Sequence, residues 1–426
     1  MPGLKVQIEY QGAFVPVGDI IWTSDADAVF VYENSYMKRD SARPVSVSLP
    51  FQKDPFSPGQ TRNYFEGLLP EGYTRMCIAE QLSVDGQNYL SVLKYLGREC
   101  LGALKITEEG VEEEAPGYTL LTHEELKAFA REGAMKSAQL VIRSHLSLTG
   151  ASGKTGLYLN PSDGRWYLPH GTAPSTHIVK QSHIRLKNIV ANEMLCLHTA
   201  RKLGIDVSEF FMVPAQAMET GTELYATRRY DRVFLKNTKR VSGLPAPVRL
   251  HQEDFAQALG IPAAGKYERN GEHYLKQAFD LLRNVSSDPI RDQLKLWDIC
   301  IFNYLIGNTD NHIKNFSLLY SVDMQSVRLA PAYDIVSTLL YEGSTENMAV
   351  SIGGEYNIRN ITRESFESEA KSLGLGVKPA MHRFDDMHGK FDAALLESMA
   401  ELSDVYPGLE LQDACERILK IHKLRL

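Results

Sequence analysis

A polar loop with Asp310 and, five positions later, Asn315 constrains this chain more than any other feature of its sequence. The loop follows the apolar, helix-like segment 297–307 and precedes apolar, strand-like residues. A second acidic residue, Asp334, also stands between apolar segments. Phosphoryl transfer from a nucleotide needs a carboxylate that orients a hydroxyl, and an amide and a carboxylate that hold Mg²⁺. The order of these residues therefore favours a kinase over the alternative, in which they only close turns.

A run of small residues upstream predicts a loop that binds phosphates. It reads Ser147-Leu-Thr-Gly-Ala-Ser-Gly-Lys-Thr-Gly156. Small side chains let backbone N–H groups approach phosphate oxygens, and Lys154 adds a mobile positive charge. The structural alternative is an ordinary hairpin turn. The residues that we expect to contact ATP here are Gly150, Ala151, Ser152, Gly153, Lys154 and Thr155.

Near its end this run contains Gly153-Lys154-Thr155, and a Walker A loop ends in the same three residue types. However, Leu148 stands where that motif has a glycine. The alternation of residues 157–168 predicts strand, turn and strand, whereas a Walker A loop leads directly into a helix. A flexible glycine-rich loop between strands fits a kinase-type lid better. A Walker-type nucleotide triphosphatase is therefore a distant third interpretation, after an active kinase and a catalytically weak, kinase-like binding protein.

A strand that ends in a lysine follows the loop. In Thr176-His-Ile-Val-Lys180 the branched residues predict a short strand, and a kinase carries the lysine that holds the α- and β-phosphates on such a strand. Residues 188–203 predict a helix with an apolar face and a stop at Gly204. Glu193 on this helix is the candidate partner of Lys180. The alternatives are a surface lysine and a solvated helix glutamate.

A further strand-like segment, 224–228, runs into the charged residues 229–232. In a kinase with two lobes the hinge falls here, with main-chain groups that face the adenine. We therefore expect Arg229 and Tyr230 to contact ATP. The alternative is a surface strand that ends in solvated arginines.

Short motifs along most of the chain resemble those of one known family, the HipA toxin kinases of bacterial toxin–antitoxin pairs. Each motif is short, but their order is specific. They are Pro44–Pro50, Asn63–Glu71, Gly97–Ala103, Ser147–Ala151, Thr176–Lys180, Arg229–Arg232, Gln252–Asp254, Thr309–Ser317 and Tyr333–Ser337.

The resemblance implies an α+β chain with a two-lobed, protein-kinase-like fold, an extra N-terminal β-rich subdomain and a mostly helical C-lobe. The expected parts are a family N-terminal subdomain in 1–138, a kinase N-lobe with the phosphate loop in 139–231, and a helical C-lobe with the catalytic and metal-binding loops in 232–426. ATP and Mg²⁺ are the implied cofactors. The implied partners are a protein substrate and a HipB-like DNA-binding antitoxin.

The same resemblance implies roles for single residues. Asp310 is then the catalytic base, and Ser147 is the site at which the kinase phosphorylates itself. The loop departs from the usual Gly-Ala-Gln-x-Lys of the family, because Ser152 replaces the glutamine and Gly153 precedes the lysine. This departure predicts a more flexible loop. The remaining assignments are Asn315 and Asp334 as Mg²⁺ ligands, Lys180 as the phosphate-holding lysine, and Glu193, His312 and Lys314 as supporting residues, with a purely structural His312 as the alternative.

Composition excludes several other classes. The 426 residues carry a formal net charge of −7, so we expect contact with DNA only indirectly, through the antitoxin. The five cysteines are scattered and form no C-x-x-C pair, so neither a zinc site nor a disulfide framework is indicated. The N-terminus alternates like a strand, and the most apolar helix is short and contains Asp298. We therefore expect a cytoplasmic protein that does not contact a membrane.

Two functions from different classes remain. The first is a Ser/Thr protein kinase toxin that acts on a protein hydroxyl, for which the family suggests an aminoacyl-tRNA synthetase, and on its own Ser147. The second is a catalytically weak, kinase-like protein that binds an antitoxin and acts as co-repressor of its operon. A binding module has no need for the whole set of Lys180, Asp310, Asn315 and Asp334, so the set favours the enzyme.

Overall fold

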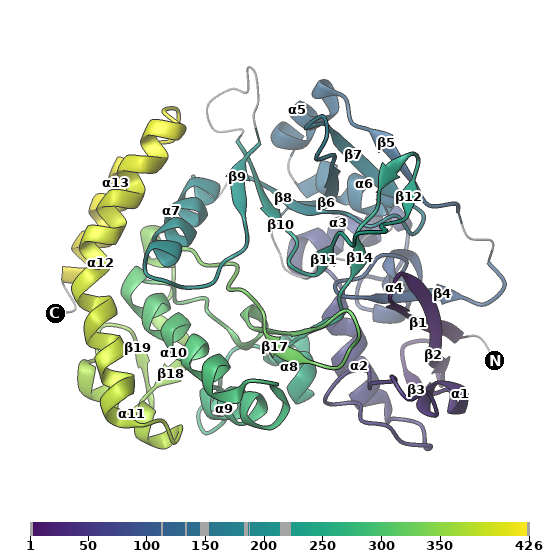
Figure 1. Cartoon of the computed structure of the whole chain (residues 1–426), viewed down its shortest axis with the longest axis horizontal. Helices are drawn as coiled ribbons and strands as arrows, with labels where there is room; N and C mark the ends of the chain where they lie inside the picture. Colours follow the sequence, from purple (N-terminus) through teal and green to yellow (C-terminus); the bar gives the residue numbers. More distant parts are fainter. Residues whose placement is uncertain are drawn as a thin grey trace. The chain divides into compact units, whose positions relative to one another are not determined.

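The computed structural model describes residues 3–111, 114–132, 134–144, 153–182, 186, 188–213 and 223–423 (Figure 1). Its contacts divide the chain into two compact units, and both are discontinuous in sequence. Unit 1 comprises Met1–Ile184, Phe210–Ala263 and Leu318–Val327, and unit 2 comprises Arg185–Glu209, Ala264–Ser317 and Arg328–Leu426. Within the described part of the chain, no helix combines the length and the apolar character needed to cross a membrane.

Unit 1 begins with a four-stranded antiparallel sheet in the order β3-β2-β1-β4. Alternate residues of β1, among them Leu4, Val6 and Ile8, are buried, as the alternation of the sequence predicts. Short helices connect β3 to β4. The bounds are β1 Gly3–Tyr10, β2 Ala13–Trp22, β3 Ala28–Tyr32, β4 Leu104–Glu108, α1 Asn34–Met37, α2 Pro58–Phe65, η1 Glu66–Leu68, α3 Gly72–Leu82 and α4 Tyr89–Leu96.

A second sheet of unit 1 has six strands in the order β5-β7-β6-β8-β10-β9. One face of it is apolar and packs against helices α5 and α6, with Leu157, Val179, Phe129 and Leu140 in one buried cluster. This packing fixes which side chains of each strand point to the other face. The bounds are β5 Gly117–Leu120, β6 Lys154–Leu159, β7 Trp166–His170, β8 His177–Gln181, β9 Phe210–Met212, β10 Leu224–Arg228, α5 His123–Glu132 and α6 Ala134–Ser144.

The rest of unit 1 is built from short strands. The hairpin of β16 and β17 contributes its middle part, Leu318–Val327, to this unit. The remaining bounds are β11 Arg232–Val233, β12 Arg240–Val241, β13 Leu244–Pro245, β14 Val248–Arg249, β15 Gln252–Asp254, α8 Phe255–Leu259, η2 Ala263–Gly265, β16 Ser317–Tyr320 and β17 Val327–Leu329.

Unit 2 is mostly helical, and α12 packs against α7 and α10. The side chain of Trp297 on α10 is fully buried and contacts Phe366 of α11 edge to face. Together with the sheets of unit 1 this gives the α+β class that the sequence predicts. The bounds are α7 Ile189–Lys202, α9 Tyr274–Val285, α10 Pro289–Ile306, η3 Ile313–Asn315, η4 Thr338–Leu340, β18 Asn347–Ile352, β19 Glu355–Asn357, α11 Arg363–Ser372, α12 Val377–Val405 and α13 Gln412–Lys423.

Candidate functional site

Asp310 lies in the loop that follows α10 in unit 2, as the sequence predicts. The helix ends at Gly307, whose positive φ of 76° suits glycine at a helix C-terminus. The Asn308 side chain accepts the Asp310 N–H at 3.1 Å and donates to Asn303 Oδ1 at 2.7 Å. Because Asn303 is fully buried in α10, the helix fixes the main chain of the loop. The Asp310 side chain itself is exposed.

Asn315 is tied to Asp310 within the same loop. Its Nδ2 donates to the main-chain oxygen of Asp310 at 3.0 Å. The same oxygen accepts the N–H of His312 at 2.9 Å, and His312 in turn accepts the Asn315 N–H at 2.8 Å. These bonds curl the loop into η3. With its nitrogen engaged, Asn315 retains its amide oxygen as the atom suited to a hard cation.

Asp334 has the left-handed backbone conformation, with φ of 54°. This conformation is uncommon for residues other than glycine, and it recurs at functional sites when the surroundings enforce it. Here the preceding residue is anchored, because the Tyr333 hydroxyl donates to the Lys314 main-chain oxygen at 2.9 Å and bonds Ser317 Oγ at 2.6 Å. The residue before Asp334 is therefore tied to the residue before Asn315. Hydrogen bonds thus link the segments that carry the three residues on which the kinase prediction rests.

The chain after Asp334 is held by α7 of the same unit. The Asn192 side chain accepts the Ser337 N–H at 3.0 Å and donates to the Ser337 carbonyl at 3.0 Å. Glu193 follows Asn192 and is buried. It belongs to unit 2, whereas Lys180 belongs to unit 1, so the pairing of the two stays a prediction. The observed link of α7 to the segment that follows Asp334 is made by Asn192, which the sequence analysis did not select.

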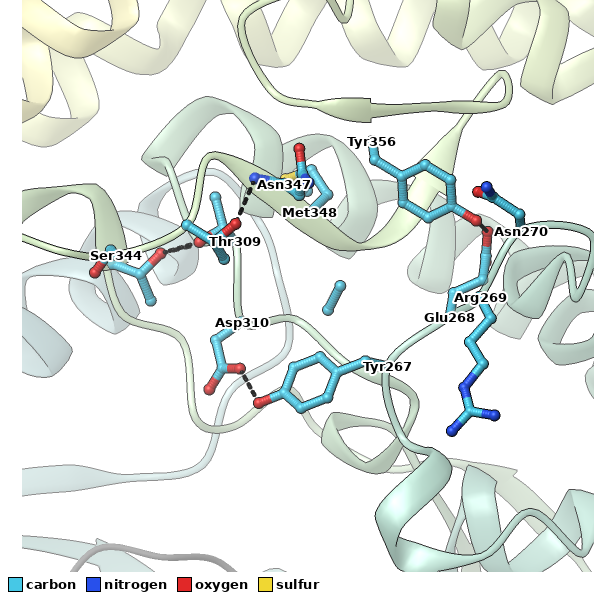
Figure 2. A pocket seen from close by; sticks show the side chains of 13 residues that line it. Tyr267, Glu268, Arg269, Asn270, Thr309, Asp310, Ser344, Asn347, Met348 and Tyr356 are labelled. Atoms are coloured by element: carbon cyan, nitrogen blue, oxygen red, sulfur yellow. Dashed lines mark hydrogen bonds between the residues drawn. The ribbon is translucent and has the colours of Figure 1, made fainter.

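A pocket of about 670 Å³ opens beside Asp310 in unit 2 (Figure 2). Its walls come from the Asp310 loop, from the loop before α9 and from the segment that follows η4. The Asp310 loop is joined to that segment, because Ala349 donates its N–H to the Thr309 carbonyl at 2.9 Å. The lining residues are Tyr267, Glu268, Arg269, Asn270, Thr309, Asp310, Thr338, Ser344, Thr345, Asn347, Met348, Ala349 and Tyr356.

Tyr267 and Glu268 are site residues that the sequence analysis missed. The Tyr267 hydroxyl donates to Asp310 Oδ1 at 2.8 Å. Glu268 accepts the Tyr274 N–H at 2.8 Å and the Tyr356 hydroxyl at 2.9 Å, which anchors the loop that carries Tyr267. Both residues stand in the polar run Gly265-Lys-Tyr-Glu-Arg-Asn-Gly271 between two helical segments. The signal available in the sequence was a tyrosine in a loop that is otherwise polar.

Lys154 and Lys180 are direct neighbours in the second sheet of unit 1. The register of β6 and β8 sets them opposite one another, and both are buried. Tyr225 on β10 flanks Lys180 on its other side, with the ammonium 6.0 Å from the ring centroid. Residues opposite each other in a sheet share a face, so two ammonium groups lie on the face away from α5 and α6. Ammonium groups on this face suit phosphate groups.

The other predicted residues of the phosphate loop are placed differently or lie outside the described residues. Thr155 is opposite Val179 in the register and is fully buried, so it points to the apolar side that packs against α5 and α6. Gly153 precedes β6 and accepts the Gln181 N–H at 3.4 Å. The predictions for Ser147, Gly150, Ala151 and Ser152 concern residues outside the described ranges.

The Arg229 side chain is a member of a buried ion cluster in unit 1. It makes a two-pronged contact with Asp231, at 2.9 and 2.7 Å, and reaches Glu99 at 3.4 Å. The sequence alternative of a solvated surface arginine is therefore wrong, and the guanidinium is committed to carboxylates. Tyr230 bonds Gln252 through its hydroxyl. That the main chain here faces adenine stays a prediction. The cluster consists of Glu9, Glu99 and Asp231 with Arg229, Arg232 and Arg249.

Ionisation in the cluster follows from its mutual contacts. Burial opposes charge on Glu99, but Arg249, Arg232 and Arg229 outweigh it and hold the pKa of Glu99 below its usual value. The pKa of Asp231 is likewise held well below its usual range, against burial, by Arg229 and Arg232. Glu99 and Asp231 therefore remain charged at neutral pH. It joins the N-terminal sheet, through Glu9, to the chain that follows β10.

Two family models match this chain. Residues 10–107 match the HipA N-terminal domain, and residues 146–395 match the HipA-like C-terminal domain. The second match alone spans more than half of the sequence, and it contains the Asp310 loop, Asp334 and both lysines. The chain therefore belongs to the HipA family, as its motifs predict.

Relatives over most of the chain are kinases by name. A protein of Sinorhizobium fredii named "Putative kinase Y4mE" is 33% identical over 92% of this chain and 91% of its own length. The serine/threonine-protein kinase toxin HipA of Shewanella oneidensis is 25% identical over 84% of this chain and 81% of its own. A solved Shewanella oneidensis HipA, in complex with HipB and operator DNA, covers 98% of this chain and 99% of its own with a TM-score of 0.74 at 21% identity. The chain is thus a homologue of Ser/Thr kinases and has the HipA fold.

Proposed function

We propose that this protein is a Ser/Thr protein kinase toxin that transfers the γ-phosphate of ATP to a protein hydroxyl. The observation that carries the proposal is the joined arrangement of Asp310, Asn315 and Asp334. An exposed carboxylate stands at the edge of a 670 Å³ pocket, and its main chain is bonded to the side chain of Asn315. Tyr333 links that loop to the strained Asp334.

Each residue has a definite task in this proposal. Asp310 orients the acceptor hydroxyl and takes its proton as the new bond to phosphorus forms. The amide oxygen of Asn315 and the carboxylate of Asp334 hold Mg²⁺, which when bound neutralises charge on the phosphates. Lys154 and Lys180 hold the phosphates, and the buried α7 keeps the Asp334 segment in place through Asn192.

The donor set fits Mg²⁺. Among the described residues there is no group of three or more His, Cys, Asp and Glu that could hold a metal ion by itself. Mg²⁺ in nucleotide sites binds one or two protein carboxylates and completes its shell with phosphates and water. One carboxylate and one amide oxygen are therefore sufficient for a site that forms with ATP.

Three finer features are part of the proposal. Ser147 becomes phosphorylated, and a phosphate there repels the phosphates of ATP and switches the enzyme off. The partner is a HipB-like antitoxin, supported by the Shewanella complex, and DNA is contacted through it because the chain is net acidic. An aminoacyl-tRNA synthetase is the candidate substrate, on the family resemblance alone.

Incubation of the purified protein with labelled ATP, Mg²⁺ and a cell lysate tests the proposal. Labelled proteins are then identified by mass spectrometry, which also reports the state of Ser147. The Asp310→Asn variant is the control for contaminating kinases. Labelling that is equal with the parent and with this variant would contradict the proposal. An active enzyme with unmodified Ser147 would contradict only the self-inhibition.

A further inference from the structure

The Tyr267 side chain contacts Asp310 in a way that the proposed roles above do not use. Its hydroxyl donates to Oδ1 of Asp310 at 2.8 Å, and Figure 2 shows the two groups facing each other at the pocket wall. Tyr267 is 46% exposed, and Asp310 is exposed as well. The bond therefore forms in solvent contact, at the surface that an acceptor protein would reach.

The ring of Tyr267 is held on two sides. It meets the His312 ring edge to face, with centroids 5.3 Å apart and an interplanar angle of 85°. The Lys266 ammonium lies 5.4 Å from the Tyr267 ring centroid. Aromatic and cation contacts of this kind add to the attraction that fixes a ring. His312, a residue of the catalytic loop, thus serves as a packing surface for Tyr267.

The backbone beneath Tyr267 is also fixed. Glu268 accepts hydrogen bonds from the Ser351 hydroxyl at 2.6 Å, the Tyr356 hydroxyl at 2.9 Å and the Tyr274 N–H at 2.8 Å. These partners lie in β18, β19 and α9, so the tyrosine is presented from three elements of unit 2. A tyrosine that had no role beyond exposure to solvent would not need a loop fixed in this way.

We propose that Tyr267 is a positioning residue for phosphoryl transfer, whose hydroxyl fixes the orientation of the Asp310 carboxylate toward the acceptor hydroxyl. A hydrogen bond from a fixed donor limits the orientations of a carboxylate, and errors of about 1 Å in a reacting group cost on the order of a hundredfold in rate. A carboxylate accepts up to about four hydrogen bonds, so a phenol on Oδ1 is compatible with an acceptor hydroxyl on the same group. The inference rests on the proposed function.

The Tyr267→Phe variant tests this role because it keeps the ring and removes one oxygen. Transfer from labelled ATP to a mixture of degenerate serine- and threonine-centred peptides is measured. We expect kcat to fall about tenfold, with KM for ATP and for the peptides within about twofold. Tyr304→Phe removes a buried phenol bond to the Ile361 carbonyl, outside the pocket, and is the control for general structural effects.

A second readout needs no substrate. In protein labelled with [4-¹³C]aspartate, the Asp310 carboxyl signal is assigned by its absence from Asp310→Asn. It should shift in Tyr267→Phe and stay in place in Tyr304→Phe. An unmoved signal with unchanged kcat overturns the inference, and so does a rise in kcat/KM, because the hydroxyl would then compete with the acceptor. Peptide transfer that persists in Asp310→Asn would overturn the proposed function instead.

Discussion

The buried ion cluster of unit 1 and the Asp310 loop of unit 2 both contain charged residues, yet they differ in burial and in how their charges are paired. In the cluster three carboxylates meet three guanidinium groups, and all six side chains are buried. In the loop the Asp310 carboxylate is exposed beside an open pocket. Buried charges that satisfy one another stabilise a particular fold, whereas an exposed carboxylate on a fixed backbone is available for chemistry.

Both regions contain motifs that resemble the HipA family, so resemblance alone does not separate their roles. Arg229 belongs to one such motif, and its guanidinium is committed to Asp231 and Glu99. Asp310 belongs to another, and its carboxylate lines a pocket. Substitutions in the two regions should therefore affect different quantities, the free energy of unfolding in the first and the rate of transfer in the second.

The largest effect is expected for Asp310→Asn and Asp334→Asn. Each should lower phosphoryl transfer roughly 10²–10⁴-fold, because one loses the base and the other a metal ligand. The melting temperature should change little for Asp310, whose side chain is exposed. Transfer rates and melting curves are measured together, with Asp323→Asn, at an exposed turn in unit 1, as the control. If either Asp310→Asn or Asp334→Asn keeps an activity within tenfold of the parent, the role assigned to that residue is contradicted.

The next effect belongs to the ion cluster. Glu99→Gln leaves three guanidinium groups with two carboxylates, so we expect the free energy of unfolding to fall by about 3–5 kcal/mol. The exposed pair of Asp386 and Lys390 is the control, and Asp386→Asn should cost less than about 1 kcal/mol. Denaturant unfolding of both variants gives these values. Equal effects at the two sites would show that the cluster is not a stabilising element.

The pH dependence of the same variant adds a second check. Because the arginines outweigh burial and lower the pKa of Glu99, its charge stabilises the fold above the ordinary value of 4.5. That contribution is lost as pH falls through the lower pKa of the folded state. The difference in unfolding free energy between the parent and Glu99→Gln should therefore shrink on acidification below about pH 4.5.

A smaller effect is expected for Lys180→Met. Without one ammonium of the pair, phosphates are held less well, and kcat at saturating Mg-ATP should fall roughly 10–100-fold with little change in stability. Lys236→Met, at an exposed position in unit 1, is the matched control. Unaltered turnover of Lys180→Met would favour the interpretation of Lys180 as a structural lysine.

The smallest effect concerns Glu253, which is buried in unit 1 and accepts bonds from Tyr320 Oη at 2.7 Å and Val47 N–H at 3.1 Å. Burial raises the pKa of Glu253 from 4.5 to about 7. Because the folded state holds this proton more tightly than the unfolded state, the raised pKa stabilises the fold fully at a pH below the unfolded pKa of 4.5. This stabilisation is lost as the pH rises through about 7, the pKa in the folded state. Relative to Glu253→Gln, the parent should therefore lose about 1–3 kcal/mol between pH 4.5 and pH 8. Denaturant unfolding of both proteins at several pH values tests this. A difference in unfolding free energy that does not vary with pH would contradict the raised pKa of Glu253.

Local patterns allowed much of the fold and part of the site to be predicted. The alternation of β1 and the helix-loop-strand order around Asp310 were read correctly because each depends on neighbours in sequence. Tyr267 was missed because its partner Asp310 is 43 residues away. Arg229 was interpreted as a hinge residue because its partner Glu99 lies 130 residues upstream, and no local pattern predicts their contact.

The sequence by itself determined the family, the α+β class and the chemical identity of the set Lys180, Asp310, Asn315 and Asp334, because motif order and residue type are local properties. Tertiary structure decided which polar groups are buried and which side of a strand each residue faces. The register of β6 and β8 places Lys154 beside Lys180 and turns Thr155 toward the core. The Tyr333 bond to the Lys314 carbonyl ties the Asp334 segment to the Asp310 loop. Such contacts join residues that are distant in the chain, and only the packed fold brings them together.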